Sequence, residues 1–369
     1  MVASTATDAR RTTNRKHVTK EQVYGTDRRW RRFGEPVPAG TSLREDGTPD
    51  LGLFGPGSLM WEVILHPAVI VFETPAQVHM QFLYRPIGAG IRDWDPVSRR
   101  AVDGTLTFYD SFERVQRNAG MHAPMWLGDT TTATRMWKHL LQIHRSVRGE
   151  LMDTGAPELG GYDAAGQRES MWAALSELHP MLHIYEKFAF RDGRLPRRLS
   201  DAERDQYVAE GAAYVNFGGA DPAETPTTMA ELDALYDKYR ELWTHSKTLH
   251  ISPETGKDVK MTGPMLKNFH ITQMRLFIPL VFQLGMYLPV MGAFPDDIRR
   301  RAAGFGPVRD LAARASLILS LPVIWFMQRP RIERYFMRLM WGPDGVRLIE
   351  SARELHEAEK RRRREAATR

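Results

Sequence analysis

The sequence has 369 residues, of which 42% are hydrophobic and 26% are charged, as in an ordinary globular protein with a sizeable core. It contains no cysteine, which excludes disulfides, cysteine nucleophiles, thiolate-bound zinc, cysteine-held iron–sulfur clusters and thiolate-ligated or covalently attached c-type haem. Any metal must therefore be bound by His, carboxylate, Tyr or Met side chains, and 12 histidines are present.

The formal net charge of +6 lies largely at the two ends of the chain. Residues 1–35 form a basic arm that we expect to be disordered, and a second basic run follows residue 359. No nucleic-acid-binding motif accompanies these charges, so no nucleic-acid partner is expected. The first 35 residues lack an apolar signal segment, which favours a cytoplasmic location. Peripheral contact with an anionic membrane, through the basic ends and the uncharged run 276–294, is a further expectation.

The elements predicted along the chain are helices. Ser58 is a suitable N-cap for a helix over residues 59–72, and Ser200-x-x-Glu203 and Thr228-x-x-Glu231 have the spacing of capping boxes. Apolar periodicity predicts the remaining helices over residues 76–89, 104–117, 131–151, 167–190, 201–213, 229–242, 266–291, 296–303, 308–327 and 332–340.

Residues 342–345 are predicted to form a turn before a charged C-terminal helix or tail over residues 346–369. No strand pattern of useful length, internal repeat or glycine-rich phosphate loop is present. The sequence therefore predicts an all-α fold with a single multi-helix globular domain over residues 54–345.

The first candidate site lies in the predicted helix 131–151. His144 follows an apolar helical face, and Arg148 shares that face four residues later. Imidazole is a ligand for iron, zinc and copper, and a guanidinium pairs with carboxylates such as a haem propionate. A hydrogen-bonded core histidine beside a surface arginine is the alternative.

Two further segments carry candidate residues. His179 and His183 are four residues apart on one helical face, as in helical metal pairs, although the Glu of the H-E-x-x-H motif is missing between them. Asp95-Pro96 predicts a turn that precedes Arg99 and Arg100. Structural histidines and solvated surface arginines are the alternatives for these segments.

Over roughly residues 54–340 the chain resembles the oxygenase MpaB / latex-clearing-protein (rubber oxygenase) catalytic-domain family. The resemblance rests on the order and spacing of short motifs: Gly55-Pro56-Gly57-Ser58-x-x-Trp61, Gln81, Asp95-Pro96-x-x-Arg99, His144-x-x-Val147-Arg148-Gly149, Trp172 with Tyr185, Leu199-Ser200-x-Ala202-Glu203, Pro226-x-Thr228-x-x-Glu231-Leu232, Leu288-Pro289 and Arg329-Pro330.

This resemblance implies an all-helical fold with a pocket for haem b, whose members use dioxygen to cleave double bonds in isoprenoid chains. It implies His144 as the proximal iron ligand and Arg99 near the haem. The family usually has a threonine four residues after that arginine; here the position is Asp103, and Thr105 is the nearest threonine. The family also often has a histidine at the position of Ala174, for which His179 is the nearby substitute.

The expected catalytic residues are thus Arg99 and Thr105, and the expected haem-binding residues are His144, Arg148, Arg99 and His179. Residues 118–130, with His122 and Trp126, resemble an insertion that shapes the substrate entrance. The expected partners are dioxygen and a hydrophobic or isoprenoid small molecule. The alternatives are a non-catalytic haem-binding protein, a non-haem metalloprotein that uses His179 and His183, and a membrane-peripheral interaction protein.

Overall fold

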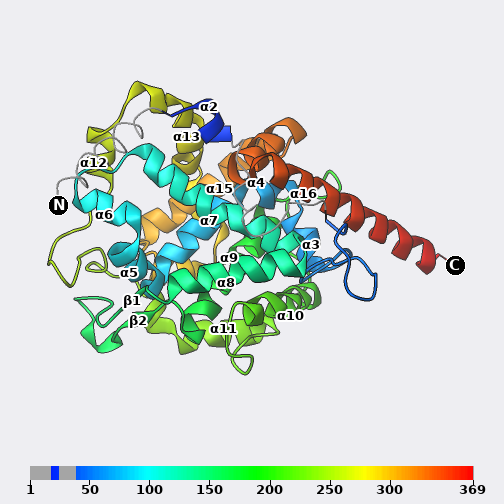
Figure 1. Ribbon diagram of the computed structural model, residues 1–369, viewed down its shortest axis with the longest axis horizontal. Coiled ribbons are helices and arrows are strands. Elements are labelled where there is room, and N and C mark those ends of the chain that lie inside the picture. Colours follow the sequence, from blue (N-terminus) through cyan, green and yellow to red (C-terminus); the bar gives the residue numbers. More distant parts are fainter. Residues whose placement is uncertain (1–17, 25–38, 369) are drawn as a thin grey trace.

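The computed structural model describes residues 18–24 and 39–368 (Figure 1). Within these residues the chain forms helices and one sheet of two short antiparallel strands, so the predicted all-α fold is confirmed. Most of the basic arm predicted over residues 1–35 lies outside the described residues.

The first half of the chain builds the centre of the molecule. Its elements are α2 (Lys20–Tyr24), α3 (Leu59–Ile64), α4 (Pro67–Leu83), α5 (Arg85–Trp94), α6 (Pro96–Val102), α7 (Phe108–Leu127), α8 (Thr130–His144), β1 (Arg148–Gly149), η2 (Pro157–Leu159), β2 (Tyr162–Asp163) and α9 (Gln167–Phe188).

The second half covers this centre from several sides. Its elements are α10 (Asp201–Phe217), α11 (Met229–Lys238), η3 (Arg240–Trp243), α12 (Thr262–Lys267), η4 (Ile271–Leu276), α13 (Phe277–Gly285), α14 (Tyr287–Ala293), the π-helix η5 (Ile298–Ala302), α15 (Pro307–Met327) and α16 (Pro330–Ala367).

The predicted helix starts are confirmed where a side chain caps the helix. The hydroxyl of Ser58 accepts a hydrogen bond from the backbone N–H of Trp61 (3.1 Å). Ser200 and Glu203 form the predicted capping box at the start of α10. Thr228 accepts from the N–H of Glu231 at the start of α11. These local hydrogen bonds satisfy donors that a helix leaves free in its first turn.

Several predicted helix boundaries were wrong. The helix predicted over residues 59–72 breaks at His66, because the residue before Pro67 is disfavoured in a helix and instead caps α4. The region predicted as one helix over residues 266–291 is divided into α12, η4, α13 and α14. At residues 342–345 there is a kink within α16, where Gly342 adopts a φ of 70°, instead of a turn between two separate helices.

The core lies around α4 and α9, which pack against each other along their length. Nearly every residue of α9 from Glu169 to Phe188 is buried, and α4 has a continuous buried run from Ala68 to Gln77. In Figure 1, α10 and α11 lie below α8 and α9, and α12 and α13 lie above α7. Side chains of α4 and α9 therefore contact several neighbouring helices.

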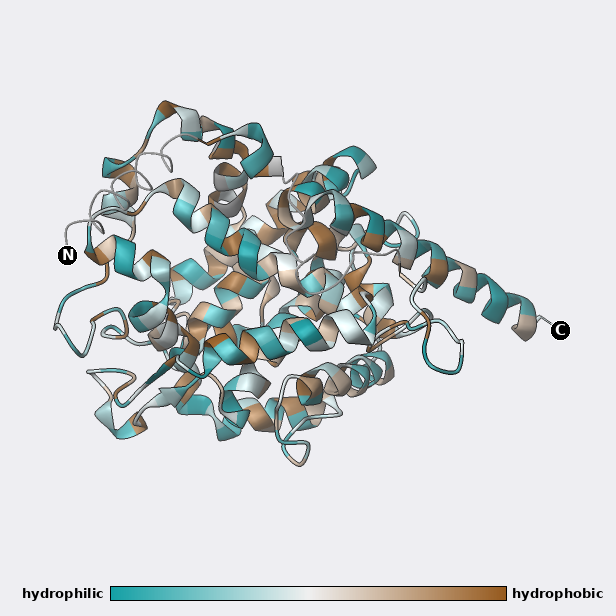
Figure 2. Ribbon diagram, viewed as in Figure 1, coloured by the Kyte–Doolittle hydropathy of each residue, from teal (hydrophilic) through white to brown (hydrophobic). Residues whose placement is uncertain are grey.

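The C-terminal helix α16 is anchored before it projects from the body of the molecule (Figure 1). The Nε2 of His356 lies 2.9 Å from Glu62 of α3, while its Nδ1 accepts from the N–H of Gly57 (3.0 Å). Lys360 adds a second bond to Glu62 (2.7 Å). The last turns beyond this anchor are mostly hydrophilic (Figure 2), as predicted for a charged terminal helix.

Candidate functional site

His144 is the last residue of α8, and the sequence of this helix explains where its side chain lies. Asp129 caps the helix by accepting from the N–H of Thr132 (2.6 Å). Met136 is fully buried, and His144, at the end of the helix, is half-buried. Its Nδ1 atom is buried.

The His144 imidazole has one ring nitrogen available. Its Nδ1 is buried and has no hydrogen-bond partner among the described residues. Burial and the charge of Arg114 lower the pKa of His144, although a backbone hydrogen bond at Ala164 and the charge of Glu177 oppose them. The ring is therefore neutral at neutral pH. A neutral imidazole with an unpaired buried nitrogen is available as a metal ligand.

A buried polar cluster lies between α4, α7, α9 and α10. It consists of Glu73, Gln77, His122, Glu177 and Tyr214, and we call it the His122 cluster. Nδ1 of His122 lies 3.3 Å from Glu73, and its Nε2 lies 3.3 Å from Glu177 and 3.3 Å from the Gln77 amide. The hydroxyl of Tyr214 donates to Glu177 (2.7 Å). The cluster therefore holds one imidazole between two carboxylates inside the core.

The His122 ring is protonated at neutral pH. Burial alone lowers its pKa, but the charges and hydrogen bonds of Glu177 and Glu73 outweigh burial and raise the pKa to about 10. Trp126, one helical turn later, stacks on the ring with a centroid separation of 4.9 Å. The His122 imidazolium is therefore held between two carboxylates and is covered by an indole, in a part of the core that contains little water.

Glu177 and Arg114 connect His144 to this cluster. Glu177 is within electrostatic range of His144 as well as bound to His122. Arg114 of α7 also acts on His144, and it forms an ion pair with Asp95, the N-cap of α6. The charges of Arg114 and of Glu177 in the His122 cluster therefore both act on the His144 ring, in opposite directions.

Three of the predicted site residues occupy the surface side of this region. Arg99 is exposed, and its guanidinium lies 5.8 Å from the centre of the Trp94 ring. Thr105 lies in the turn after α6, where its N–H donates to the carbonyl of Arg100 (2.9 Å). Arg148 is exposed on β1. A role for Arg99, Thr105 or Arg148 in binding haem stays a prediction.

Arg148 does not share a helix with His144, so the predicted helix 131–151 was too long. The chain leaves the helix after His144 because β1 pairs with β2, with Gly149 opposite Tyr162. A Cβ atom on Gly149 would lie 2.7 Å from the Tyr162 ring, so this pairing needs glycine. Strands of only two residues each are too short to leave an alternating pattern in the sequence, so they were not predicted.

His179 and His183 lie on another side of α9. His179 follows Glu177 by two residues, about 200° around the helix axis, and its Nδ1 lies 3.0 Å from the hydroxyl of Tyr236 of α11. The rings of His179 and His183 are 4.3 Å apart, and burial lowers the pKa of both. Among the described residues, no group of three or more His, Asp or Glu side chains is placed to hold a metal ion.

The residues that the sequence analysis missed are Glu73, Arg114 and Glu177. A signal existed for the two carboxylates, because Glu73 follows the run Val69–Phe72 and Glu177 precedes Leu178 within a strongly apolar helix. Charged residues on an inward helical face require a partner. The partner, His122, was placed in a segment interpreted as an insertion at the substrate entrance. In the structure, α7 continues through Leu127 and the His122 ring is buried, and a role of this segment at the substrate entrance stays a prediction.

The fold defines an all-α protein whose interior holds several buried histidine side chains. A model of the family described as "ER-bound oxygenase mpaB/B'/Rubber oxygenase, catalytic domain" matches residues 61–340. The chain belongs to this family, which identifies it as an oxygenase and therefore as an oxidoreductase with dioxygen and a small molecule as substrates. In the same comparisons no curated protein and no solved structure matched the chain.

Proposed function

We propose that this protein is a haem-dependent oxygenase in which His144 is the iron ligand, and that it cleaves a double bond of a hydrophobic, isoprenoid-type substrate. The observation that carries the proposal is the buried Nδ1 of His144, which has no hydrogen-bond partner in the described part of the chain. An unpaired buried nitrogen costs free energy, so such an atom in a native protein calls for a ligand.

The residues around His144 fit a b-type haem. Haem needs a single imidazole from the protein, whereas a non-haem metal site needs several ligands. His144 supplies a neutral ring whose buried Nδ1 has no hydrogen-bond partner in the described part of the chain. The absence of cysteine leaves histidine as the commonest axial ligand available. His179 offers a second unpaired Nε2, but Tyr236 already binds the other nitrogen of its ring.

Haem bound at His144 would supply the activation of dioxygen. The chain supplies orientation, charge and protection from water. Asp95 fixes Arg114, whose positive charge suits the carboxylates of a propionate side chain. Glu73 and Glu177 keep a proton on His122, and Trp126 covers that ring. Because these charged side chains are already fixed by their ion pairs, they do not need to rearrange during the reaction.

Cleavage of a carbon–carbon double bond by dioxygen leaves one oxygen atom on each carbon as a carbonyl group. Atoms and electrons then balance without a separate reductant. An apolar substrate also suits the aromatic-rich interior, which contains Trp61, Trp172 and Trp243 among its fully buried side chains. The proposal thus needs only the two substrates that the oxygenase class already implies.

A haem titration followed by an activity measurement tests the proposal. The purified protein, titrated with haemin, should develop an intense Soret band that saturates at one haem per chain. With squalene or a short polyisoprene as substrate, the loaded protein should consume dioxygen and form carbonyl products. Isotopically labelled dioxygen should label both carbonyls.

The outcomes separate the alternatives. A Soret band without turnover of any isoprenoid would make the protein a haem-binding protein without this activity. Turnover that is unaffected by haem but lost with a chelator would indicate a non-haem metal instead, with His179 and His183 as the candidates.

A further inference from the structure

Exposed apolar side chains are concentrated in two segments of the described chain. Fourteen of the twenty large hydrophobic side chains that are exposed lie within residues 266–284 and 308–326. The first segment spans α12, η4 and α13, and the second is most of α15. Exposed large apolar side chains that gather in this way are typical of interaction surfaces. We call these two segments the apolar face.

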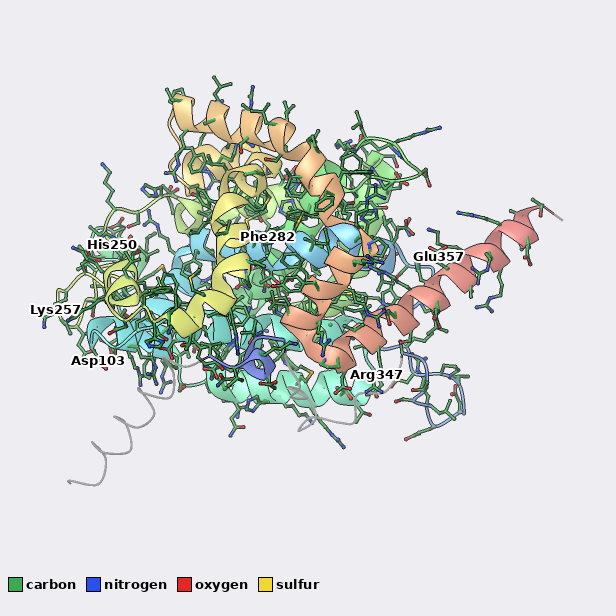
Figure 3. The ribbon with its side chains drawn as sticks, turned by 90° about the horizontal axis from the view of Figure 1, so that it is seen from above. Asp103, His250, Lys257, Phe282, Arg347 and Glu357 are labelled. Carbon is green, nitrogen blue, oxygen red and sulfur yellow. The ribbon has the colours of Figure 1, made fainter. Side chains whose placement is uncertain are left out.

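Both segments lie on the side of the molecule seen in Figure 3, with α13 in yellow and α15 in orange. Phe282 of α13 points inward there, and its ring lies 5.4 Å from Phe72 of α4 and 4.6 Å from Phe336 of α16. The inner side of α13 is therefore attached to the core, while Ile278, Val281 and Leu284 on its outer side are exposed. A cleft of about 450 Å³ beside Ile271 and Met274 adjoins this segment.

Helix α15 is long and apolar enough to cross a membrane, yet only 17% of its most apolar stretch is buried in the protein. It is attached along one side. Asp310 at its start pairs with the buried Arg299 (2.6 Å), and a Cβ atom on Gly292 of α14 would lie 2.3 Å from the carbonyl of Ala313. This close packing favours a helix that lies along a surface with its outer side free over one that crosses a bilayer.

The exposed charges of the apolar face are all positive, since its one carboxylate, Asp310 at the start of α15, is buried. Residues 259–295 and 311–332 contain no Asp or Glu. Each stretch carries three exposed basic side chains, namely Lys260, Lys267, Arg275, Arg314, Arg329 and Arg331. At the end of α15, Arg329 stacks on Trp325 with 3.8 Å between its guanidinium carbon and the ring centre. An exposed tryptophan with a neighbouring arginine is typical of side chains at the boundary between lipid tails and headgroups.

We propose that the apolar face docks the protein onto an anionic phospholipid bilayer. The outer side chains of α13 and α15 enter the boundary of the acyl chains, and the surrounding Lys and Arg side chains contact anionic headgroups. The enzyme is thereby held at the membrane, where a hydrophobic substrate is concentrated. The docking itself does not depend on the identity of the cofactor or of the substrate.

The charge pattern favours a bilayer over a second copy of the chain. A symmetric dimer through this face would bring the six basic side chains of one copy against the same six of the other, with no carboxylate from these stretches to pair with them. An anionic lipid surface supplies the missing negative charge.

Paired leucine substitutions test the proposal. Leu284 and Leu319 are 69% and 79% exposed on the apolar face, and Leu195 and Leu43 are 69% and 66% exposed elsewhere. The full-length wild type, the double variant Leu284→Glu/Leu319→Glu and the control Leu195→Glu/Leu43→Glu would be sedimented with vesicles made of equal parts phosphatidylcholine and phosphatidylserine. Because all four side chains are exposed, neither variant should disturb the fold, which circular dichroism and haem binding check.

The wild type and the control should bind these vesicles equally, and the face variant should bind at least about tenfold more weakly, since two carboxylates would have to enter the apolar boundary. Vesicles of phosphatidylcholine alone should bind the wild type weakly. Equal binding of all three proteins would overturn the proposal and assign the binding to the basic ends of the chain, which every variant keeps.

No binding by the wild type would also overturn it. A wild-type dimer that the face variant converts to a monomer in sedimentation velocity would assign the face to self-association. A protein that binds vesicles but shows no Soret band would leave the docking intact while refuting the proposed haem chemistry.

Discussion

The His122 cluster supports a quantitative prediction for the substitution His122→Gln. Glutamine keeps a hydrogen-bonding side chain but removes the positive charge that lies 3.3 Å from each of Glu73 and Glu177. Removal of one partner from a buried ion pair typically costs about 3–5 kcal/mol, because a carboxylate is left unpaired in the core. The rise of the His122 pKa from 6.5 to about 10 corresponds to roughly 5 kcal/mol, at the upper end of that range.

For a domain of this length, such a loss lowers the melting temperature by about 4–6 °C at pH 7. The effect also depends on pH. Because folding raises the pKa of His122, its stabilisation is complete below pH 6.5 and disappears as the pH rises to about 10. The difference in melting temperature between wild type and His122→Gln should therefore be largest below pH 6.5, should remain large at pH 7 and should shrink as the pH rises to about 10.

Thermal melts followed by circular dichroism at pH 7 and pH 10 measure both effects. His250→Gln is the matched control, since His250 is exposed and lies 3.7 Å from Asp258 at the surface. Its substitution should change the melting temperature by less than about 1 °C. A His122→Gln protein that melts with the wild type at pH 7, or that stays equally destabilised at pH 10, would refute the assignment of a protonated ring between two carboxylates.

Three further substitutions have expected outcomes. Gly292→Ala should create a clash between α14 and α15 that lowers the free energy of unfolding by about 1–3 kcal/mol and therefore lowers the melting temperature. Gly285→Ala should leave the melting temperature unchanged, because there is open space around Gly285. Glu62→Gln should destabilise the protein at pH 7, because the His356 hydrogen bond and the charge of Lys360 lower the Glu62 pKa to about 2 despite burial. This stabilisation is present above pH 4.5, so the difference in melting temperature between wild type and Glu62→Gln should vanish as the pH falls towards 2. Arg114→Gln should reduce oxygenase turnover by tenfold or more, and Arg99→Gln by less; the reverse order in a dioxygen-uptake assay would return the pocket role to Arg99.

The helical fold was predictable because its signals are local. Ser58 and Ser200 cap helices through hydrogen bonds to residues three positions later, and these bonds were confirmed. Predictions failed where a contact from a distant segment decides the conformation. The helix predicted to continue to residue 151 ends at His144 because Gly149 pairs with Tyr162. No pattern within residues 131–151 contains that information.

The candidate site was predictable only in part for the same reason. His144 was predicted from its motif and lies at the end of α8 with a buried, unpaired Nδ1, and its role as the iron ligand stays a prediction. The His122 cluster was not predicted, since Glu73, His122 and Glu177 come from three helices that are far apart in the sequence. The apolar run 276–294 was expected to meet a membrane, whereas the exposed apolar side chains lie partly before it and largely on α15. Exposure depends on which helix side packs, and packing is a property of the whole fold.

The most direct test of the proposed iron ligand is a haem titration of two single variants. His144→Ala should fold, as judged by circular dichroism, but should lose the saturable Soret band, because a haem without its protein ligand is held only by apolar contacts and propionate pairing. His179→Ala should keep most of the haem, since Tyr236 already binds the His179 ring. If instead His144→Ala binds haem with an unchanged spectrum and His179→Ala is colourless, the iron ligand lies on α9 and the central claim is wrong.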